Sequence, residues 1–243
     1  LDGDGRVDLA VTNFYGEGST LYHNLGQGSF TDRSRESGLW VSSRYRLGFG
    51  IAFSDLDNDG RLDVIPANGH VNDLKGVYPY AMPTQVMWNL GNGRFQEVAP
   101  PEDSPLNRPI VGRGLATGDL DNDGRMDVVI LTQNEPLLVL HNQTEPAGHW
   151  ASFRLEGTKS NRDAIGAVVT VKSGGRTRVL QRFGGGSYQS SIDPRLHLGL
   201  KDARRIESVE VRWPSGHVDR HQDLNADTRY LIREGDPAPC VQR

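Results

Sequence analysis

The sequence contains a single cysteine and no long hydrophobic segment. With only Cys240, the chain can form neither an internal disulfide nor a cysteine-based metal site. Its longest apolar runs, such as Val128–Leu131 and Leu137–Leu140, are far shorter than the roughly 20 residues of a membrane helix. We therefore expect no membrane span.

An excess of charge of one sign is also missing. The formal net charge is −4, and no basic patch with interleaved aromatic residues is present, which argues against a nucleic-acid partner. Segments of helical periodicity are scarce, whereas the 29 glycines are spread along the chain, as expected for many short strands joined by tight turns. The composition favours an all-β protein, and the length of 243 residues favours two domains.

Three copies of an aspartate-rich segment are present before residue 130. The copies contain the equivalent residues Asp2, Asp57 and Asp121, which are 55 and 64 residues apart. A Gly-x-Gly segment precedes the second and third copies, and an Asn-Leu-Gly turn follows the first two at Asn24 and Asn89. Each repeat is therefore predicted to contain a strand, an acidic loop, a strand, a turn and a further strand.

The complete acidic loops place aspartates at positions 1, 3, 5 and 9 and a glycine at position 6. Such closely spaced carboxylates repel one another unless a hard cation neutralises them. Ca²⁺ takes six to eight oxygen ligands, and the backbone carbonyl at position 7 would supply one of them. We predict about one Ca²⁺ per loop, with the first loop lacking position 1. The predicted ligands are Asp2, Asp4, Arg6 and Asp8; Asp55, Asp57, Asp59, Arg61 and Asp63; and Asp119, Asp121, Asp123, Arg125 and Asp127, the arginines through their carbonyl oxygens.

An EF-hand loop begins in the same way, but it needs a glutamate at position 12 and flanking helices. Position 12 is Pro66 in the second loop and Ile130 in the third, and the residues after position 9 are typical of buried strands. Ordinary Asp/Asn/Gly turns are the alternative for any single loop. Three copies in the same register favour metal sites instead.

The acidic loops and the Phe-Gly-type strands together resemble the FG-GAP or VCBS repeats of integrin-like β-propellers, over roughly residues 1–145. The resemblance implies propeller blades that bind calcium. Propellers generally close with four to eight blades, so three repeats cannot form a closed ring. Because the chain also begins inside a repeated motif, we expect upstream blades of the same chain or an open partial array, with any signal peptide upstream.

A polar stretch, Gln143–His149, separates the repeats from a second region of short strands and turns. We predict a small β-sandwich over residues 150–235 and a tail over residues 236–243. Four segments of this region are informative, namely Asn161–Ala167, Gly185–Ser191, Asp193–Leu200 and Val211–Gly216. Together they resemble the ASPIC/UnbV domain, over most of residues 158–224. The resemblance implies a secreted or cell-surface, calcium-dependent protein, because that family pairs this domain with FG-GAP-type repeats.

The second domain also contains the residue types of a hydrolase, namely Ser187, Asp193 and His197. The Gly-x-Ser-x-Gly motif of a nucleophile elbow is absent, because Gln189 replaces its second glycine. We therefore assign no catalytic residue and expect these side chains to fix turns.

About ten extra residues are inserted in the second repeat, between its acidic loop and its Asn-Leu-Gly turn. Aromatic side chains on a long loop over a rigid β scaffold are typical of a recognition surface, although an ordinary packed loop remains the alternative. The candidate partner-binding residues of this insert, residues 69–85, are His70, Tyr78, Tyr80 and Met82.

Two classes of function stay open. We favour a secreted or cell-surface binding or adhesion module without catalytic activity, for a protein or glycan ligand, because every strong motif is structural or metal-binding. The alternative is an extracellular polysaccharide-active enzyme, or a scaffold associated with one, whose active site lies in upstream blades or in the insert. The fold alone does not decide between them.

Overall fold

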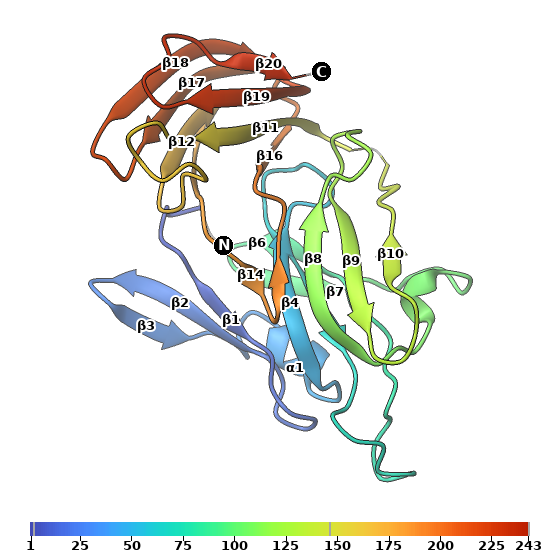
Figure 1. The fold of residues 1–243 in the computed structure, drawn as a ribbon. Coiled ribbons are helices and arrows are strands. Elements are labelled where there is room, and N and C mark those ends of the chain that lie inside the picture. Colours follow the sequence, from blue (N-terminus) through green and yellow to red (C-terminus); the bar gives the residue numbers. More distant parts are fainter. Residues whose placement is uncertain (2, 146, 243) are drawn as a thin grey trace.

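Most of the regular structure is β-strand, in small sheets that form two groups (Figure 1). The computed structural model describes residues 1, 3–145 and 147–242. The predicted all-β fold, with partial propeller blades followed by a β-sandwich, is confirmed. Nowhere in these residues is there a helix with the length and hydrophobicity of a membrane span.

Three antiparallel sheets correspond to the three sequence repeats. Only one short α-helix, α1 (Leu39–Ser43), and one 3-10 turn, Pro105–Asn107, interrupt the strands in the described part of this region. The first sheet contains β1 (Leu9–Val11), β2 (Thr20–Gly26) and β3 (Ser29–Asp32); the second contains β4 (Gly48–Ser54), β5 (Asp63–Asn68), β6 (Met87–Gly91) and β7 (Arg94–Glu97); and the third contains β8 (Gly112–Gly118), β9 (Asp127–Thr132) and β10 (Leu138–Leu140).

Strand β5 is buried along its whole length and joins two hydrophobic cores. Val64 packs with Leu39 and Met87 beside the first blade, whereas its neighbour Ile65 packs with Leu115 of the third blade. Adjacent residues of a strand point to opposite faces, so β5 is covered on both sides. The apolar residues that follow the acidic loop are therefore consecutive because both faces of β5 are buried.

The second domain consists of two four-stranded sheets that face each other. Phe153, Val169, Val211, Trp213 and Tyr230 lie in the core between them. One sheet has the order β16 (Leu196–Lys201), β11 (His149–Glu156), β19 (Thr228–Arg233), β20 (Cys240–Gln242), and the other has the order β13 (Arg176–Gln181), β12 (Val168–Ser173), β17 (Arg205–Arg212), β18 (Val218–Asn225).

The segment predicted as a tail contributes an edge strand to this sandwich. Strand β20 pairs antiparallel with β19 from Arg229 to Leu231, so the second domain reaches at least to Gln242. A two-stranded hairpin, β14 (Gly186–Ser187) and β15 (Ser190–Ser191), extends from the same domain to lie beside β4 and β8 (Figure 1). There the hydroxyl of Ser187 accepts the backbone N–H of Ile51 at 2.9 Å.

Glu234 ties the loop after β11 to the end of β19. Its Oε2 accepts the backbone N–H groups of Thr158, Lys159 and Ser160 at 2.9, 2.8 and 2.7 Å, and the Ser215 hydroxyl donates to Oε1. Burial alone would raise the pKa of Glu234, but these hydrogen bonds outweigh it and lower the pKa to about 2.

We expect Glu234→Gln to lower the free energy of unfolding by about 2 kcal/mol at neutral pH, because the remaining acceptor oxygen is uncharged and the second acceptor oxygen is replaced by a donor. A folded-state pKa below the ordinary value of 4.5 means that this stabilisation is complete above that value and is lost as the pH falls toward about 2. Urea unfolding at pH 7 and at about pH 2.5 should therefore show a smaller difference between variant and parent in acid.

Glu207→Gln is the matched control, because among the described residues this exposed carboxylate accepts one long hydrogen bond, from Gly175 at 3.4 Å. Equal destabilisation by the two variants at neutral pH would contradict the role given to Glu234.

Candidate metal centres

The second acidic loop, residues 55–63, joins β4 to β5 and brings three carboxylates together. One oxygen each of Asp55, Asp57 and Asp63 lies within 4.8 Å of the others. Asp55 and Asp63 are both only 3% exposed, whereas Asp57 is partly exposed. The loop thus holds a group of oxygen atoms at its closed end.

Backbone N–H groups aim these carboxylates inward. The N–H of Gly60 donates to Asp55 Oδ2 at 2.8 Å, and those of Leu56 and Asn89 donate to the two oxygens of Asp63 at 3.1 and 2.8 Å. Gly60 has a φ of +85°, so a side chain at this position would strain the turn. The glycine at position 6 therefore lets the chain close around the carboxylates.

The electrostatics of this loop are unfavourable without a cation. Burial raises the pKa of Asp55 well above its ordinary value, and the charges of Asp59 and Asp63 raise it further. Burial also raises the pKa of Asp63 to about 7, against the hydrogen bonds from the backbone of Asn89 and Leu56. A positive ion at this point would stabilise the ionised carboxylates.

The third acidic loop, residues 119–127, repeats the arrangement between β8 and β9. Asp119, Asp121 and Asp127 place one oxygen each within 4.8 Å of the others. Asp119 is 4% exposed, and its Oδ1 is buried without a hydrogen-bond partner among the described residues. A buried oxygen without a donor is costly unless an ion binds it, so the residues present fit a cation.

The aspartates at position 5 behave differently from their neighbours. Asp59 forms an ion pair with Arg61, and Asp123 forms one with Arg125, so each position-5 carboxylate contacts the arginine at position 7. Binding of an ion by Asp59 and Asp123 stays a prediction. Positions 1, 3 and 9 therefore converge, while position 5 turns toward its arginine. Contacts of the predicted carbonyl ligands with an ion stay a prediction.

The first acidic loop does not contribute to any of the metal-ligand groups found in the described residues. Asp2 lies outside those residues, and Asp4 forms an ion pair with Arg6. The carboxylate of Asp8 accepts the N–H of Asn24 at 2.8 Å. A calcium ion in this loop therefore stays a prediction.

One residue of a further group was not predicted from the sequence. His141 Nε2 lies 3.1 Å from Asp121 Oδ2, and together with Asp123 these residues form an exposed group beside the third loop. The signal available was the position of His141 directly before Asn142, in the degenerate turn of the third repeat.

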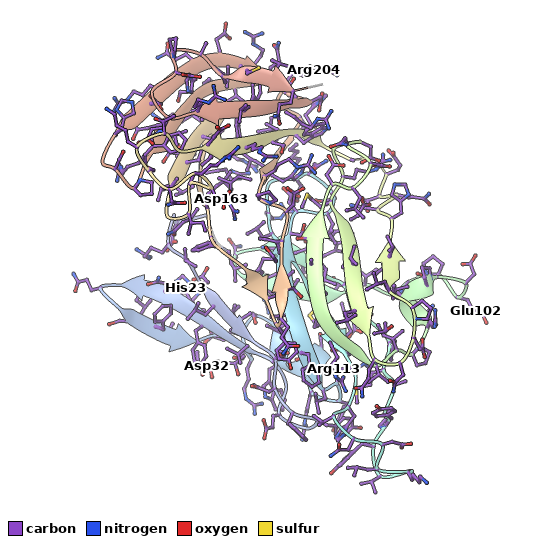
Figure 2. All side chains as sticks on the ribbon, in the orientation of Figure 1. His23, Asp32, Glu102, Arg113, Asp163 and Arg204 are labelled. Atoms are coloured by element: carbon purple, nitrogen blue, oxygen red, sulfur yellow. The ribbon has the colours of Figure 1, made fainter. Side chains whose placement is uncertain are left out.

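The insert of the second repeat is buried toward its two ends and exposed in its middle, residues 71–79. His70 and Met82 are 2% and 1% exposed, so their side chains lie inside the protein, whereas Tyr78 is 40% exposed and Tyr80 is half-buried. Arg113, which is labelled in Figure 2, lies near the start of β8. It donates to the carbonyl oxygen of His70 at 2.9 Å and holds this end of the insert on the third blade. Only the tyrosines keep the surface position that partner binding requires.

The hydrolase-type residues of the second domain each have a different partner. Ser187 binds the backbone of β4, Asp193 binds Arg195, and His197 Nε2 lies 2.7 Å from Asn58 Oδ1. Burial lowers the pKa of His197 to about 4. No hydrogen bond joins these three side chains to one another among the described residues, which agrees with the absence of a nucleophile-elbow motif.

Sequence reasoning missed that the second domain docks on the second acidic loop. The N–H of Gly199 donates to Asp55 Oδ2 at 3.1 Å, and the N–H of Lys201 donates to the carbonyl of Asn58 at 2.8 Å. The carboxylate at position 1 of the metal loop therefore also belongs to the interface between the domains.

The residue directly before β16, Arg195, docks on the third loop. Arg195 donates to Asn122 Oδ1 at 2.7 Å and to the carbonyl of Asp119 at 2.6 Å. The two loops are joined by Asn58, whose side chain donates to the carbonyl of Gly124 at 3.0 Å. An asparagine at position 4 of both complete loops was the available signal.

Comparison with known proteins agrees with this architecture. A model of the FG-GAP-like repeat matches residues 1–65 and 76–130, and a model described as ASPIC and UnbV matches residues 157–239. Cartilage acidic protein 1 of Xenopus tropicalis is 26% identical over 82% of this chain, and that of Homo sapiens is 25% identical over 82%. The chain spans only 38% and 37% of the length of these relatives.

We expect Gly199→Ala to weaken the docking of the second domain. A Cβ at this position would lie 2.2 Å from Asp55 Oδ2 and 2.4 Å from the carbonyl carbon of Asn58, so the backbone of the loop would have to shift at a cost in free energy. Overpacking of this kind costs about 1–3 kcal/mol. Hydrogen exchange should show faster exchange in residues 55–63 and unchanged protection in β12 and β17.

Gly184→Ala serves as the control, because its Cβ would meet only the end of the Ile165 side chain, at 3.3 Å. Unchanged exchange in the acidic loop of the Gly199 variant would contradict the docking described above.

Proposed function

Because the chain consists of FG-GAP-like repeats followed by an ASPIC and UnbV domain, we propose that it is an extracellular, calcium-binding module that binds a partner without catalysis. Ca²⁺ in the second and third acidic loops fixes the blades and the second domain to each other. The observation that carries this proposal is the convergence of buried carboxylates, with the Oδ1 of Asp119 lacking any donor in the described residues.

The donor set favours calcium over a transition metal. Both groups that contain position 1 of a loop consist of carboxylates alone, and hard oxygen ligands suit Ca²⁺ or Mg²⁺, whereas zinc sites use imidazole or thiolate. Mg²⁺ demands a regular octahedron, while Ca²⁺ accepts an irregular set of carboxylate, carbonyl and water oxygens. When bound, Ca²⁺ supplies positive charge and no redox or acid–base chemistry.

The residues of the loops and of the second domain act together in this role. Asp57, Asp63 and one oxygen of Asp55 hold the ion, while Asp55 Oδ2 accepts the N–H groups of Gly60 and Gly199. Removal of the ion leaves the same carboxylates buried and mutually repulsive beside β16. Loss of calcium would therefore loosen the loop and the domain interface together.

An extracellular location is supported by the relatives and by the chemistry. The similar proteins are named for cartilage, a tissue rich in extracellular matrix, and calcium modules outside cells work at millimolar concentrations of the ion. A role without catalysis is supported by the separate partners of Ser187, Asp193 and His197.

Thermal unfolding with calcium, with magnesium and with a chelator tests the proposal. We expect a rise in Tm that is selective for calcium, because a site occupied at a hundredfold excess over its Kd contributes about 2.7 kcal/mol. Asp57→Asn and Asp121→Asn should each remove about half of this rise, since each substitution weakens one of the two complete loops.

Asp103→Asn, in an exposed loop away from both sites, should leave the calcium response unchanged. A Tm that is equal in calcium and in chelator would contradict the proposal. An equal rise in Tm with magnesium and with calcium would contradict the assignment of calcium.

A further inference from the structure

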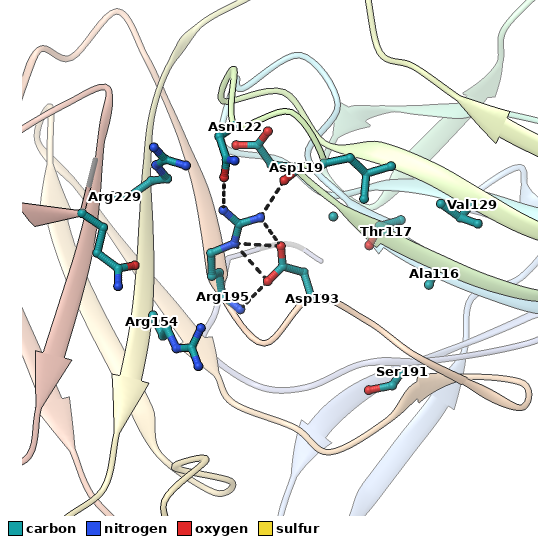
Figure 3. A pocket seen from close by; sticks show the side chains of 13 residues that line it. Ala116, Thr117, Asp119, Asn122, Val129, Arg154, Ser191, Asp193, Arg195 and Arg229 are labelled. Carbon is teal, nitrogen blue, oxygen red and sulfur yellow. Dashed lines mark hydrogen bonds and ion pairs between the residues drawn. The ribbon is translucent and has the colours of Figure 1, made fainter.

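A cavity lies between the third blade and the second domain, beside the third acidic loop (Figure 3). Its volume is about 550 Å³, which is within the range of small-molecule sites. Ala116, Leu120 and Val129 give it an apolar wall on the blade side. The opposite wall is formed by β11, β19 and β20 and is basic.

The basic wall comes from the outer face of one sheet. Arg154 on β11 and Arg229 on β19 alternate with the core residues Phe153 and Tyr230, so both point away from the sandwich core. In the register between β11 and β19, Arg229 is paired with Ser152, which lies two residues before Arg154. The two arginines are therefore diagonal neighbours, with their Cα atoms about 8 Å apart. Their long side chains can reach a single anion.

Neither of these arginines has an ion-pair or side-chain hydrogen-bond partner in the part of the chain that the structure describes. Arg233 lies four residues after Arg229 on β19 and differs from it in having an ion-pair partner. It pairs with Glu156 on β11 at 3.5 Å. The same two strands therefore carry a neutralised arginine outside the cavity and two unpaired arginines that line it.

The two carboxylates that line the cavity do not cancel this charge. Asp193 is bound by Arg195, with Nε at 3.0 and 2.8 Å from its two oxygens, as the dashed lines in Figure 3 show. Asp119 turns its Oδ2 to the N–H of Gly124 at 3.1 Å, inside the acidic loop. The charges of Arg154 and Arg229 are left for a ligand.

We propose that this cavity binds a carboxylate-bearing molecule of the size of one sugar ring, such as an acidic monosaccharide unit of a glycan. The planar guanidinium groups of Arg154 and Arg229 match the two oxygens of a carboxylate. The apolar wall of Ala116 and Val129 covers the C–H face of the ring, and Ser191 and Gln242 lie at hand for its hydroxyls. This inference rests on the proposed binding role, for which it names a class of ligand.

Titration calorimetry or NMR with glucuronate, in calcium buffer, tests the assignment. Two compounds serve as controls. Glucose has the same ring as glucuronate but no carboxylate, and sulfate is an anion without a ring. We expect glucuronate to bind at least tenfold more tightly than either. Arg154→Gln and Arg229→Gln should each weaken glucuronate binding about tenfold, and Arg233→Gln, on the same strand but paired with Glu156, should not change it.

Failure of glucuronate to bind, or equal weakening by all three substitutions, would overturn the proposal. Sulfate binding as tight as glucuronate would overturn the sugar-sized ligand. The melting experiment with calcium reports on the metal loops alone, so a calcium response without glucuronate binding would refute this site and leave the proposed function standing.

Discussion

Carboxylates that are buried close to one another set the central constraint on this molecule. In each complete loop, three oxygens lie within 4.8 Å of one another, and most of the aspartates involved are almost inaccessible to water. Such a group is stable only when positive charge or many donors compensate it. The backbone N–H groups of each loop supply part of this compensation, and the second domain supplies another part through Gly199 and Arg195.

The blades and the second domain are therefore coupled through polar contacts at the loops more than through a shared hydrophobic core. The core of the sandwich and the cores of the blades are separate clusters. Between them, hydrogen bonds run from β16 and its preceding segment to the backbone and side chains of both acidic loops. Anything that changes the charge of the loops acts directly on this junction.

The local pattern of the sequence was sufficient for the fold and for the convergence of three aspartates in each complete loop. Positions 1, 3 and 9 of the second and third loops converge because the glycine at position 6 closes the turn, and both features are visible in the sequence. The ion pairs of Asp59 and Asp123 were less evident, although an arginine stands at position 7 each time. The spacing of residues within a loop does not reveal which carboxylates form ion pairs with a neighbouring arginine.

Contacts between distant segments could not be predicted in the same way. The burial of His70 and Met82 depends on β8 and on the first blade, and the docking of Gly199 on Asp55 joins residues 144 positions apart. The placement of Arg154 and Arg229 as diagonal neighbours, without an ion-pair partner among the described residues, depends on the register between β11 and β19, which no repeat in the sequence encodes.

The lone thiol of the chain lies on the edge strand that borders the arginine-lined cavity. Cys240 is exposed and stands two residues before Gln242, so both side chains lie on the same face of β20. A fluorophore attached there through a thioether would need no engineered cysteine and would be confined to one position. The chain thus provides its own attachment site for a spectroscopic reporter next to the junction of the two domains.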